Sequence, residues 1–232
     1  MLEGSELDQQ SGSNESCPLG AHNCWIFSEV ERLRQECRTL KEISQTDPLT
    51  GLFNYRYLIA ALDREMERTR RTGLSTGLIM IDLDHFKKIN DTYGHESGNE
   101  AIQWAGNIWR KNLRRFDIPC RYGGEEFAVV LPGIRLSQAI RTAERLRSNL
   151  TVSPANLDGQ EVSLTASFGV DIFNVRETLN IEDFIKRADR YLRDAKRKGR
   201  NRVCHKDVKA SKDSSGVSGE ERDALFATRW TR

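Results

Sequence analysis

Apolar residues along the chain follow two spacings, one typical of strands and the other of amphipathic helices. Residues 78–83 form a nearly continuous apolar run, which predicts a strand buried on both faces. A second strand pattern covers 162–173 and is expected to break at Gly169. Apolar positions at helical spacing predict helices over 53–71, 97–113, 137–150 and 181–198.

Two short apolar segments, 118–121 and 127–131, flank Gly123-Gly124 and predict a β-hairpin, because glycine allows a tight turn. A short last strand is expected at 202–204. This mixed order predicts an α/β (α+β) domain with a single central sheet backed by helices. At its start, Thr46 or Asp47 is expected to cap a helix that has Pro48 in its first turn.

The segments before and after this domain have a different composition. Residues 1–24 and 206–232 are polar and rich in Ser, Asp and Gly, so we expect flexible tails, with a short helix near 220–226. Ile26, Leu33 and Leu40 recur every seven residues and predict a short helical stalk over 25–45. The stalk would either pair as a two-stranded coiled coil or dock on the domain formed by 46–205.

Composition narrows the classes of function. The 232 residues carry a net charge of only +2, which argues against nucleic acid as the main partner. No apolar run reaches the ~20 residues of a membrane span, and the N-terminus lacks a signal-peptide pattern. Five irregularly spaced cysteines do not suit a disulfide framework. We therefore expect a cytoplasmic protein with no membrane span.

The cysteines suggest two interpretations. Cys17, His22 and Cys24 would form a metal or redox site, or they are incidental residues of a flexible segment, because zinc sites usually have four ligands at tighter spacing. Cys120 and Cys204 lie in expected strands and are interpreted as inert core residues.

Acidic residues lie at two expected strand ends. Asp82 and Asp84 close the first strand, and Glu125 and Glu126 follow the two glycines of the hairpin. Carboxylates from two strand ends can converge on one Mg²⁺, which usually binds a substrate that brings its own phosphates. The alternative is that the acids form a solvated turn and a helix cap.

Several separated motifs now identify a family resemblance. They are Asp-Pro-Leu-Thr-Gly-Leu-Phe-Asn at 47–54, Asp-Leu-Asp-His-Phe-Lys-Lys-Ile-Asn-Asp at 82–91, Tyr-Gly-His at 93–95, Arg-Tyr-Gly-Gly-Glu-Glu-Phe at 121–127 and Ala-Lys-Arg-Lys-Gly-Arg-Asn at 195–201. In order and spacing they resemble the GGDEF domain, the family of diguanylate cyclases. The resemblance implies a ferredoxin-like sheet of the nucleotide-cyclase and polymerase-palm type. It also implies that two GTP molecules are joined into cyclic di-GMP, with release of two pyrophosphates.

The resemblance assigns roles to residues around the two acidic strand ends. Asp82, Glu125 and the Leu83 carbonyl would hold Mg²⁺ or Mn²⁺, and Glu125 or Glu126 would help to deprotonate the 3′-hydroxyl. The triphosphate would contact the backbone of His85 and Phe86 and the side chains of Lys87, Lys196 and Arg200. Without the resemblance, Phe86 is simply a core residue and Lys196–Arg202 is a basic helix end that suits the helix dipole.

Base recognition is where the chain departs from the family pattern. Asn90 matches the asparagine expected to bind guanine, but its partner, commonly an Asp after Gly, is Asn99 here. An Asp accepts both guanine N–H donors, whereas Asn offers one acceptor and one donor and could also serve adenine. We therefore hypothesise relaxed selectivity and some cyclic GMP–AMP. The alternative is a tolerated replacement with slower turnover of GTP.

A product site and a dimer also follow from the resemblance. Arg114 and Asp117 match the RxxD inhibitory motif, with Arg145 as a further product-binding arginine, although RxxD is also an ordinary charged helix end. Because the product joins two nucleotides in opposite senses, two sites must face each other, which predicts a homodimer. The rival interpretations are a catalytically inactive cyclic di-GMP receptor and a scaffold whose stalk binds another protein.

Overall fold

The computed structural model describes residues 25–206. The predicted tails fall outside the described residues, together with Cys17, His22 and Cys24. The described chain divides into two units at Thr46/Asp47, and the first contains one helix, α1 (Trp25–Gln45). Ion pairs such as Glu29–Arg32 follow its surface, and Leu33 and Leu40 are exposed. Among the described residues, no helix has the length and apolar character needed to cross a bilayer.

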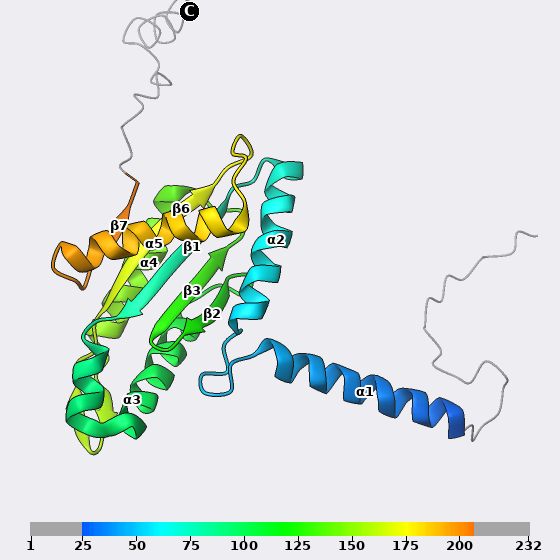
Figure 1. Ribbon diagram of the computed structural model, residues 1–232, viewed down its shortest axis with the longest axis horizontal. Coiled ribbons are helices and arrows are strands. Elements are labelled where there is room, and N and C mark those ends of the chain that lie inside the picture. The colour runs from blue at the N-terminus through cyan, green and yellow to red at the C-terminus, as the bar shows by residue number, and fades with distance from the viewer. Residues whose placement is uncertain (1–24, 207–232) are drawn as a thin grey trace, which may run out of the picture. The chain divides into compact units, whose positions relative to one another are not determined.

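The second unit is built on a five-stranded sheet with the strand order β2-β3-β1-β6-β7 (Figure 1). The strands are β1 (Thr76–Leu83), β2 (Ile118–Gly123), β3 (Glu126–Leu131), β6 (Ala166–Phe173) and β7 (Val203–His205). Neighbouring strands are antiparallel except for the parallel pair β6–β7. The helices are α2 (Tyr55–Thr72), α3 (Phe86–Lys111), α4 (Leu136–Thr151) and α5 (Ile181–Arg197). The predicted ferredoxin-like class is confirmed.

Both faces of the sheet are covered by helices, which explains why β1 is apolar along most of its length. Leu78 and Met80 point to one face, where α2 and α5 pack, as Figure 1 shows for α5. Ile79 and Ile81 point to the other face, toward α3 and α4. Full burial of each such side chain contributes about 1.5–3 kcal/mol. The central strand is thereby fixed in place, and its carboxyl end is held at a defined position.

Gly169 does not break its strand, contrary to the prediction. β6 runs without interruption from Ala166 to Phe173. A Cβ atom at Gly169 would lie 2.3 Å from both the Ala188 carbonyl oxygen and the Leu192 amide nitrogen of α5. The glycine therefore allows the backbone of α5 to approach the sheet closely.

The segment before α2 is a loop attached to β2, so the prediction of a helix from residue 53 with Pro48 in its first turn is wrong. The helix begins at Tyr55, where the Asn54 side chain accepts from the Tyr57 amide. Upstream, the Asp47 carboxylate accepts from the Thr50 amide and hydroxyl, and Phe53 forms a parallel bridge with Cys120. The local hydrogen bonds of Asp47 stabilise a turn here instead of a helix.

Two further elements differ from the sequence pattern. A small hairpin of β4 (Ala155–Leu157) and β5 (Gln160–Val162) precedes β6, so the strand predicted over 162–173 begins only at Ala166, and Val162 is the last residue of β5. Its turn is Asp158-Gly159, both with positive φ, as a two-residue hairpin requires. In addition, α3 begins at Phe86 and not at Ser97, and bends where Gly94 leaves helical geometry.

Candidate active site

The carboxyl end of β1 carries the first acidic group of the site. Asp82 is aligned with Glu126 of β3 on one side and with Ser167 of β6 on the other. Its side chain is only 10% exposed. A carboxylate buried to this extent must be compensated by a cation or by hydrogen bonds.

The hairpin between β2 and β3 brings the second acidic group to the same place. Its turn residues are Gly124, with φ of +51°, and Glu125. The Leu83 amide donates to the Glu125 carbonyl at 3.3 Å, which ties the hairpin tip to the end of β1. A Cβ at Gly123 or Gly124 would meet nothing within 4 Å. The left-handed backbone at Gly124 favours glycine here, and the space beside it is open to a ligand.

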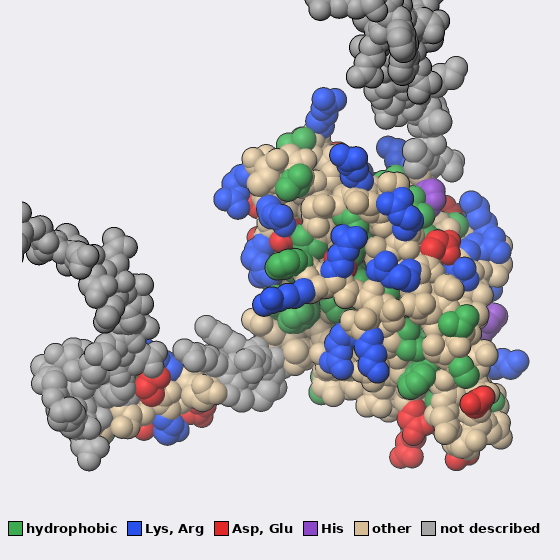
Figure 2. Space-filling view, turned by 180° about the vertical axis from the view of Figure 1, so that it is seen from behind, with side chains coloured by type: hydrophobic (Ala, Val, Ile, Leu, Met, Phe, Trp, Pro, Cys, Tyr) green, Lys and Arg blue, Asp and Glu red, His purple; other side chains and the backbone are tan. Residues whose placement is uncertain are grey.

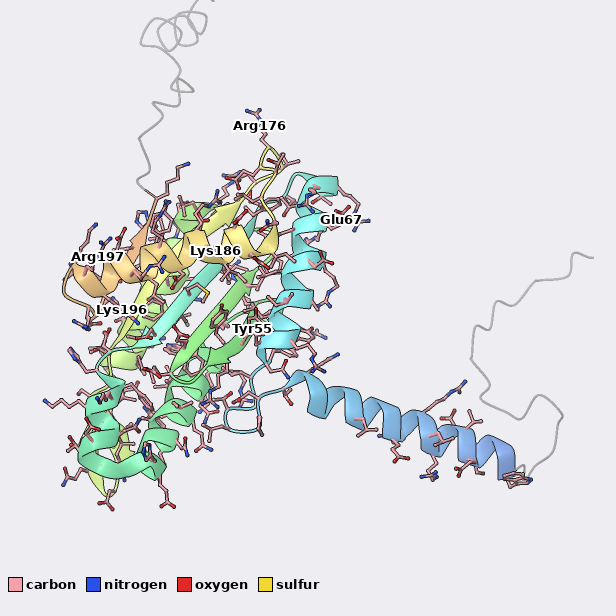
Figure 3. All side chains as sticks on the ribbon, in the orientation of Figure 1. Tyr55, Glu67, Arg176, Lys186, Lys196 and Arg197 are labelled. Atoms are coloured by element: carbon pink, nitrogen blue, oxygen red, sulfur yellow. The ribbon has the colours of Figure 1, made fainter. Side chains whose placement is uncertain are left out.

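A lysine from α5 pairs with the buried acid. Lys196 Nζ lies 2.7 Å from Asp82 Oδ2, and Figure 3 shows Lys196 projecting from the last turns of α5. Burial raises the pKa of Asp82, and the charges of Glu125 and Asp84 raise it further, while the hydrogen bond from Lys196 lowers it. The negative charge of the buried Asp82 carboxylate is therefore compensated by the Lys196 ammonium group.

Glu126 is the half-buried neighbour of these groups. Burial raises its pKa, as does the charge of Asp82 across the strand pair, and Lys196 lowers it. Asp189 of α5, which the sequence patterns did not single out, also raises the pKa of Glu126. The structure thus brings together Asp82, Leu83, Glu126 and Lys196, with Glu125 at the adjacent turn.

The chain turns sharply between β1 and α3, where phosphate contacts were predicted. His85 is left-handed, with φ of 57°, and precedes the helix as its N-cap. Phe86 is buried in the core, so its side chain has a packing role, whereas His85 and Lys87 are exposed. The first amides of a helix have no intrahelical acceptor, which makes this turn suitable for an anion. A cavity of about 370 Å³ beside the turn is lined by Asp84 and His85.

The two asparagines predicted to read the base lie on the two arms of the bent helix α3. Asn90 precedes the bend at Gly94, and Asn99 follows it. A Cβ at Gly98 would lie 1.9 Å from Asn90 Oδ1, so the Asn90 side chain rests directly against Gly98. The bend thereby brings Asn90 close to the Gly98-Asn99 pair. The Asn99 side chain is exposed.

Arg200 lies in the turn that follows α5. Its φ is 62°, and its side chain is exposed. Lys196, one turn earlier, faces Asp82. Two of the three predicted phosphate-binding cations therefore come from the carboxyl end of α5 and the turn that follows it.

The predicted product site lies at the opposite end of β2 from the hairpin tip. The Asp117 carboxylate accepts from the Arg114 amide at 2.8 Å, and the Asp117 amide donates to the Arg114 carbonyl at 3.0 Å. Burial raises the pKa of Asp117, while the Arg114 amide and the charges of Arg114 and Arg145 lower it. Arg145, on α4, donates to the Asn112 carbonyl at 3.0 Å. The three predicted residues are therefore neighbours in space.

A cavity of about 330 Å³ adjoins this turn. It is lined by Arg114 and Asp117 and also by Arg110 and Arg115, which the sequence patterns did not single out. Arg110 lies in the last turn of α3 and Arg115 lies within the RxxD sequence, so the local density of arginines was the available signal. The three arginines that line the cavity suit an anionic ligand. Lys and Arg side chains are also more numerous than acidic ones on the face of the molecule shown in Figure 2.

Two other residues have partners near the site that the sequence patterns did not predict. Asp84 is buried and accepts hydrogen bonds from β6 and from the turn after α5. Arg121 pairs with Asp47 at 3.0 Å and donates to the Gly124 carbonyl at 3.0 Å, so it joins the entry loop to the hairpin turn. Both were within quoted motifs, but the motifs do not show which partner each residue has.

Comparison with known proteins agrees with the geometry. The profile described as "Diguanylate cyclase, GGDEF domain" matches residues 44–202. The response regulator PleD of Caulobacter vibrioides is 42% identical over 76% of this chain and 39% of its own length. Diguanylate cyclase DgcP of Pseudomonas aeruginosa is 40% identical over 77% of this chain and 27% of its own length. The chain thus spans well under half of each of these two relatives.

Solved structures show the same fold. The coiled coil and GGDEF domain of DgcB from Caulobacter crescentus, in complex with c-di-GMP, is 30% identical, with a TM-score of 0.73 over 78% of this chain and 95% of that chain. Diguanylate cyclase SiaD of Pseudomonas aeruginosa, in complex with its activator SiaC, is 38% identical, with a TM-score of 0.68 over 78% of this chain and 70% of that chain. With a family profile that covers more than half of its residues, the chain belongs to the GGDEF family of diguanylate cyclases.

Proposed function

We propose that this protein is a diguanylate cyclase that condenses two GTP molecules into cyclic di-GMP and releases two pyrophosphates. The observation that supports it most is the hydrogen bond from the Leu83 amide to the Glu125 carbonyl, because it holds the GGEEF turn beside Asp82. The relatives named diguanylate cyclases and the related structure with c-di-GMP support the same reaction.

The donor set fits a divalent cation. Asp82, Glu125 and the Leu83 carbonyl would supply hard oxygen ligands, and the ion pair between Asp82 and Lys196 indicates that this carboxylate can accept a cation. In the part of the chain that the structure describes, no three acidic, histidine or cysteine side chains form a complete metal cage. Mg²⁺ or Mn²⁺ would thus be held by these two carboxylates, the Leu83 carbonyl and the phosphates of GTP. When bound, it would neutralise charge on the triphosphate and on the 3′-oxygen.

The chain's own residues would bind the substrate and move the proton. Lys87, Lys196 and Arg200 would neutralise phosphate oxygens, and the His85–Phe86 turn would donate backbone hydrogen bonds. Either Glu125 or Glu126 would accept the proton of the 3′-hydroxyl. Glu126 suits this step because burial and the charge of Asp82 raise its pKa above the usual value for a glutamate, which makes it a stronger base.

The test is production of pyrophosphate and cyclic di-GMP by the purified chain with GTP and Mg²⁺, with the product identified by mass spectrometry. Asp82→Asn and Glu125→Gln should each lower turnover at least 100-fold. Glu182→Gln is the matched control and should keep the full rate, because Glu182 is an exposed acid in the first turn of α5, at the opposite end of that helix from Lys196. Binding of cyclic di-GMP without release of pyrophosphate would instead support the inactive receptor.

Relaxed base selectivity is a second candidate, favoured by the position of Asn99 directly after Gly98, the residue against which Asn90 rests. Incubation with equal GTP and ATP should then give cyclic GMP–AMP in addition to cyclic di-GMP, and Asn99→Asp should restore the pure guanine product. Exclusive formation of cyclic di-GMP by the unaltered chain would rule this out.

The active species is proposed to be a homodimer, because each domain would hold one of the two nucleotides. Turnover per mole of protein should therefore fall when the protein is diluted. A constant value down to concentrations at which the protein is monomeric would contradict the dimer. A cytoplasmic location remains part of the proposal.

A further inference from the structure

Asp84, the second acid of the Asp82-Leu83-Asp84 sequence, has a complete set of protein donors. It is 6% exposed. Its Oδ1 accepts from the Ser167 hydroxyl at 2.6 Å, and its Oδ2 accepts from the Thr165 hydroxyl at 3.0 Å and from the Asn201 amide at 2.9 Å. A buried carboxylate that accepts three hydrogen bonds is well stabilised without a metal ion.

One of these donors lies in the turn between α5 and β7. Arg200 and Asn201 are successive non-glycine residues with φ of 62° and 42°. Asparagine tolerates left-handed backbone, but for an arginine it is unfavourable and persists only where surrounding contacts enforce it. The hydrogen bond from the Asn201 amide to Asp84 can enforce this backbone conformation. This bond links the end of β1 to a turn 117 residues later in the chain.

The same turn is also held from its other side. Asn201 Oδ1 accepts from Arg147 Nη1 at 3.0 Å and from the Thr151 hydroxyl at 3.4 Å, both on α4. Asn201 is therefore fixed by its backbone to the end of β1 and by its side chain to α4. Arg200 precedes it directly, with its own side chain exposed.

We propose that Asp84 is a positioning residue for the triphosphate: it holds the α5–β7 turn so that Arg200 faces the nucleotide phosphates. The inference depends on the proposed function, because that is where Arg200 is assigned to the substrate. It divides the two acids of the β1 end into separate roles. Asp82 faces the cation and Lys196, and Asp84 sets the geometry of the basic turn without touching substrate.

A double-mutant cycle on the full chain tests this coupling. The probe is a GTP analogue with a non-cleavable α,β-bridge, in the presence of Mg²⁺, and the measurement is its Kd by calorimetry. Arg200→Ala should weaken binding about tenfold, as expected for one lost charge-assisted contact. Asp84→Asn, which keeps the shape of the side chain, should weaken binding by a similar factor. The double variant should bind no more weakly than Arg200→Ala alone, because without the Arg200 side chain the position of the turn no longer affects a phosphate contact.

Asp171→Asn is the matched control. Like Asp84, Asp171 is a buried acid. It lies on β6, forms an ion pair with Arg187, and is aligned with Leu78, near the end of β1 that is farther from the site. Asp171→Asn should lower stability but leave the Kd equal to that of the unaltered chain. Combined with Arg200→Ala, it should leave the Kd equal to that of Arg200→Ala alone. Arg147→Ala provides a second test if Asp84→Asn does not fold, because it releases the same turn without altering a buried acid.

The outcomes separate the two claims. If Arg200→Ala leaves the Kd unchanged, the assignment of Arg200 to the phosphates fails. Arg200→Ala can also weaken binding independently of Asp84. In that case the factors by which the two single variants raise the Kd multiply in the double variant, and the positioning role of Asp84 is overturned. The same holds where Arg147→Ala replaces Asp84→Asn. An unchanged Kd in the single positioning variant has the same consequence.

Discussion

A single missing methyl group determines where the Asn90 side chain lies. Gly98 is buried in α3, and a Cβ there would overlap Asn90 Oδ1 at 1.9 Å. The overlapping atom is the end of a short side chain that can rotate away, so the helix itself need not be disturbed. A glycine is thus required at position 98 because the Asn90 side chain occupies the space of a Cβ atom, and not because of the backbone angles of Gly98.

Gly98→Ala should therefore separate stability from substrate binding. Alanine favours a helix over glycine by about 1 kcal/mol, so thermal unfolding should be unchanged or slightly raised. The displaced Asn90 should raise the KM for GTP about tenfold. Gly106→Ala, also on α3 but with ordinary contact distances, is the control and should leave the KM unaltered. An unaltered KM in Gly98→Ala would exclude a role of Asn90 in binding the base.

The RxxD turn gives a second prediction for a single residue. Arg114→Ala removes a guanidinium group that lines the 330 Å³ cavity but leaves the backbone hydrogen bond to Asp117 possible. Inhibition by added cyclic di-GMP should be lost, while the initial rate stays near that of the unaltered chain. Progress curves with and without added product are the measurement. Inhibition that persists at the same concentration would place the product site elsewhere.

At the scale of elements, the site depends on how closely α5 lies against the sheet. Gly169 of β6 allows contact with the backbone of α5 at Ala188 and Leu192. Lys196 lies one turn beyond Leu192, so the same contact sets the reach of Lys196 to Asp82. The packing of one helix on one glycine therefore supports both the core and the charged site.

Gly169→Ala should disturb both the packing of the core and the charged site. A Cβ 2.3 Å from two backbone atoms must move α5, and overpacking of this kind typically costs about 1–3 kcal/mol. Urea denaturation should show this loss, and turnover should fall in parallel. Gly159→Ala, at the β4–β5 turn with no atom within 4 Å, serves as a comparison for backbone strain alone. Unfolding free energies that match for Gly169→Ala and the unaltered chain would contradict the close-packing argument.

On the scale of the whole domain, Asp47 and Arg121 join the start of the domain to the hairpin turn. Burial acts to raise the pKa of Asp47, but hydrogen bonds from Thr50 and the charge of Arg121 outweigh it and hold the pKa below its usual 3.8. A carboxylate whose pKa is lowered by folding stabilises the folded state at pH values above its pKa in the unfolded chain. That contribution is lost as the pH falls through the lowered pKa.

Asp47→Asn should thus destabilise the domain by about 1–3 kcal/mol at neutral pH. The difference in unfolding free energy between the variant and the unaltered chain should be constant above about pH 4. It should shrink as the pH falls further, because Asp47 becomes protonated in both states. Urea titrations from pH 7 to pH 3 measure it. A difference that is independent of pH would show that the carboxylate charge does not contribute.

The sequence by itself determined the architecture and the identity of the chemical groups. Apolar spacing located the helices and the buried central strand, and the glycine pair with its acids located the hairpin, because both signals are local. Spacing failed where a residue's role depends on a distant partner. Gly169 was interpreted as a break, and residues 47–53 as the start of a helix. The bend at Gly94 was missed as well.

Only the tertiary structure decided which charges meet. Asp82 and Asp84 are two residues apart, yet one faces Lys196 and the other Asn201, Thr165 and Ser167. The sequence cannot separate them, because the distinction arises from partners more than 80 positions away along the chain. Pairing of strands and packing of α5 bring those partners to the end of β1, so the division of roles is a property of the fold.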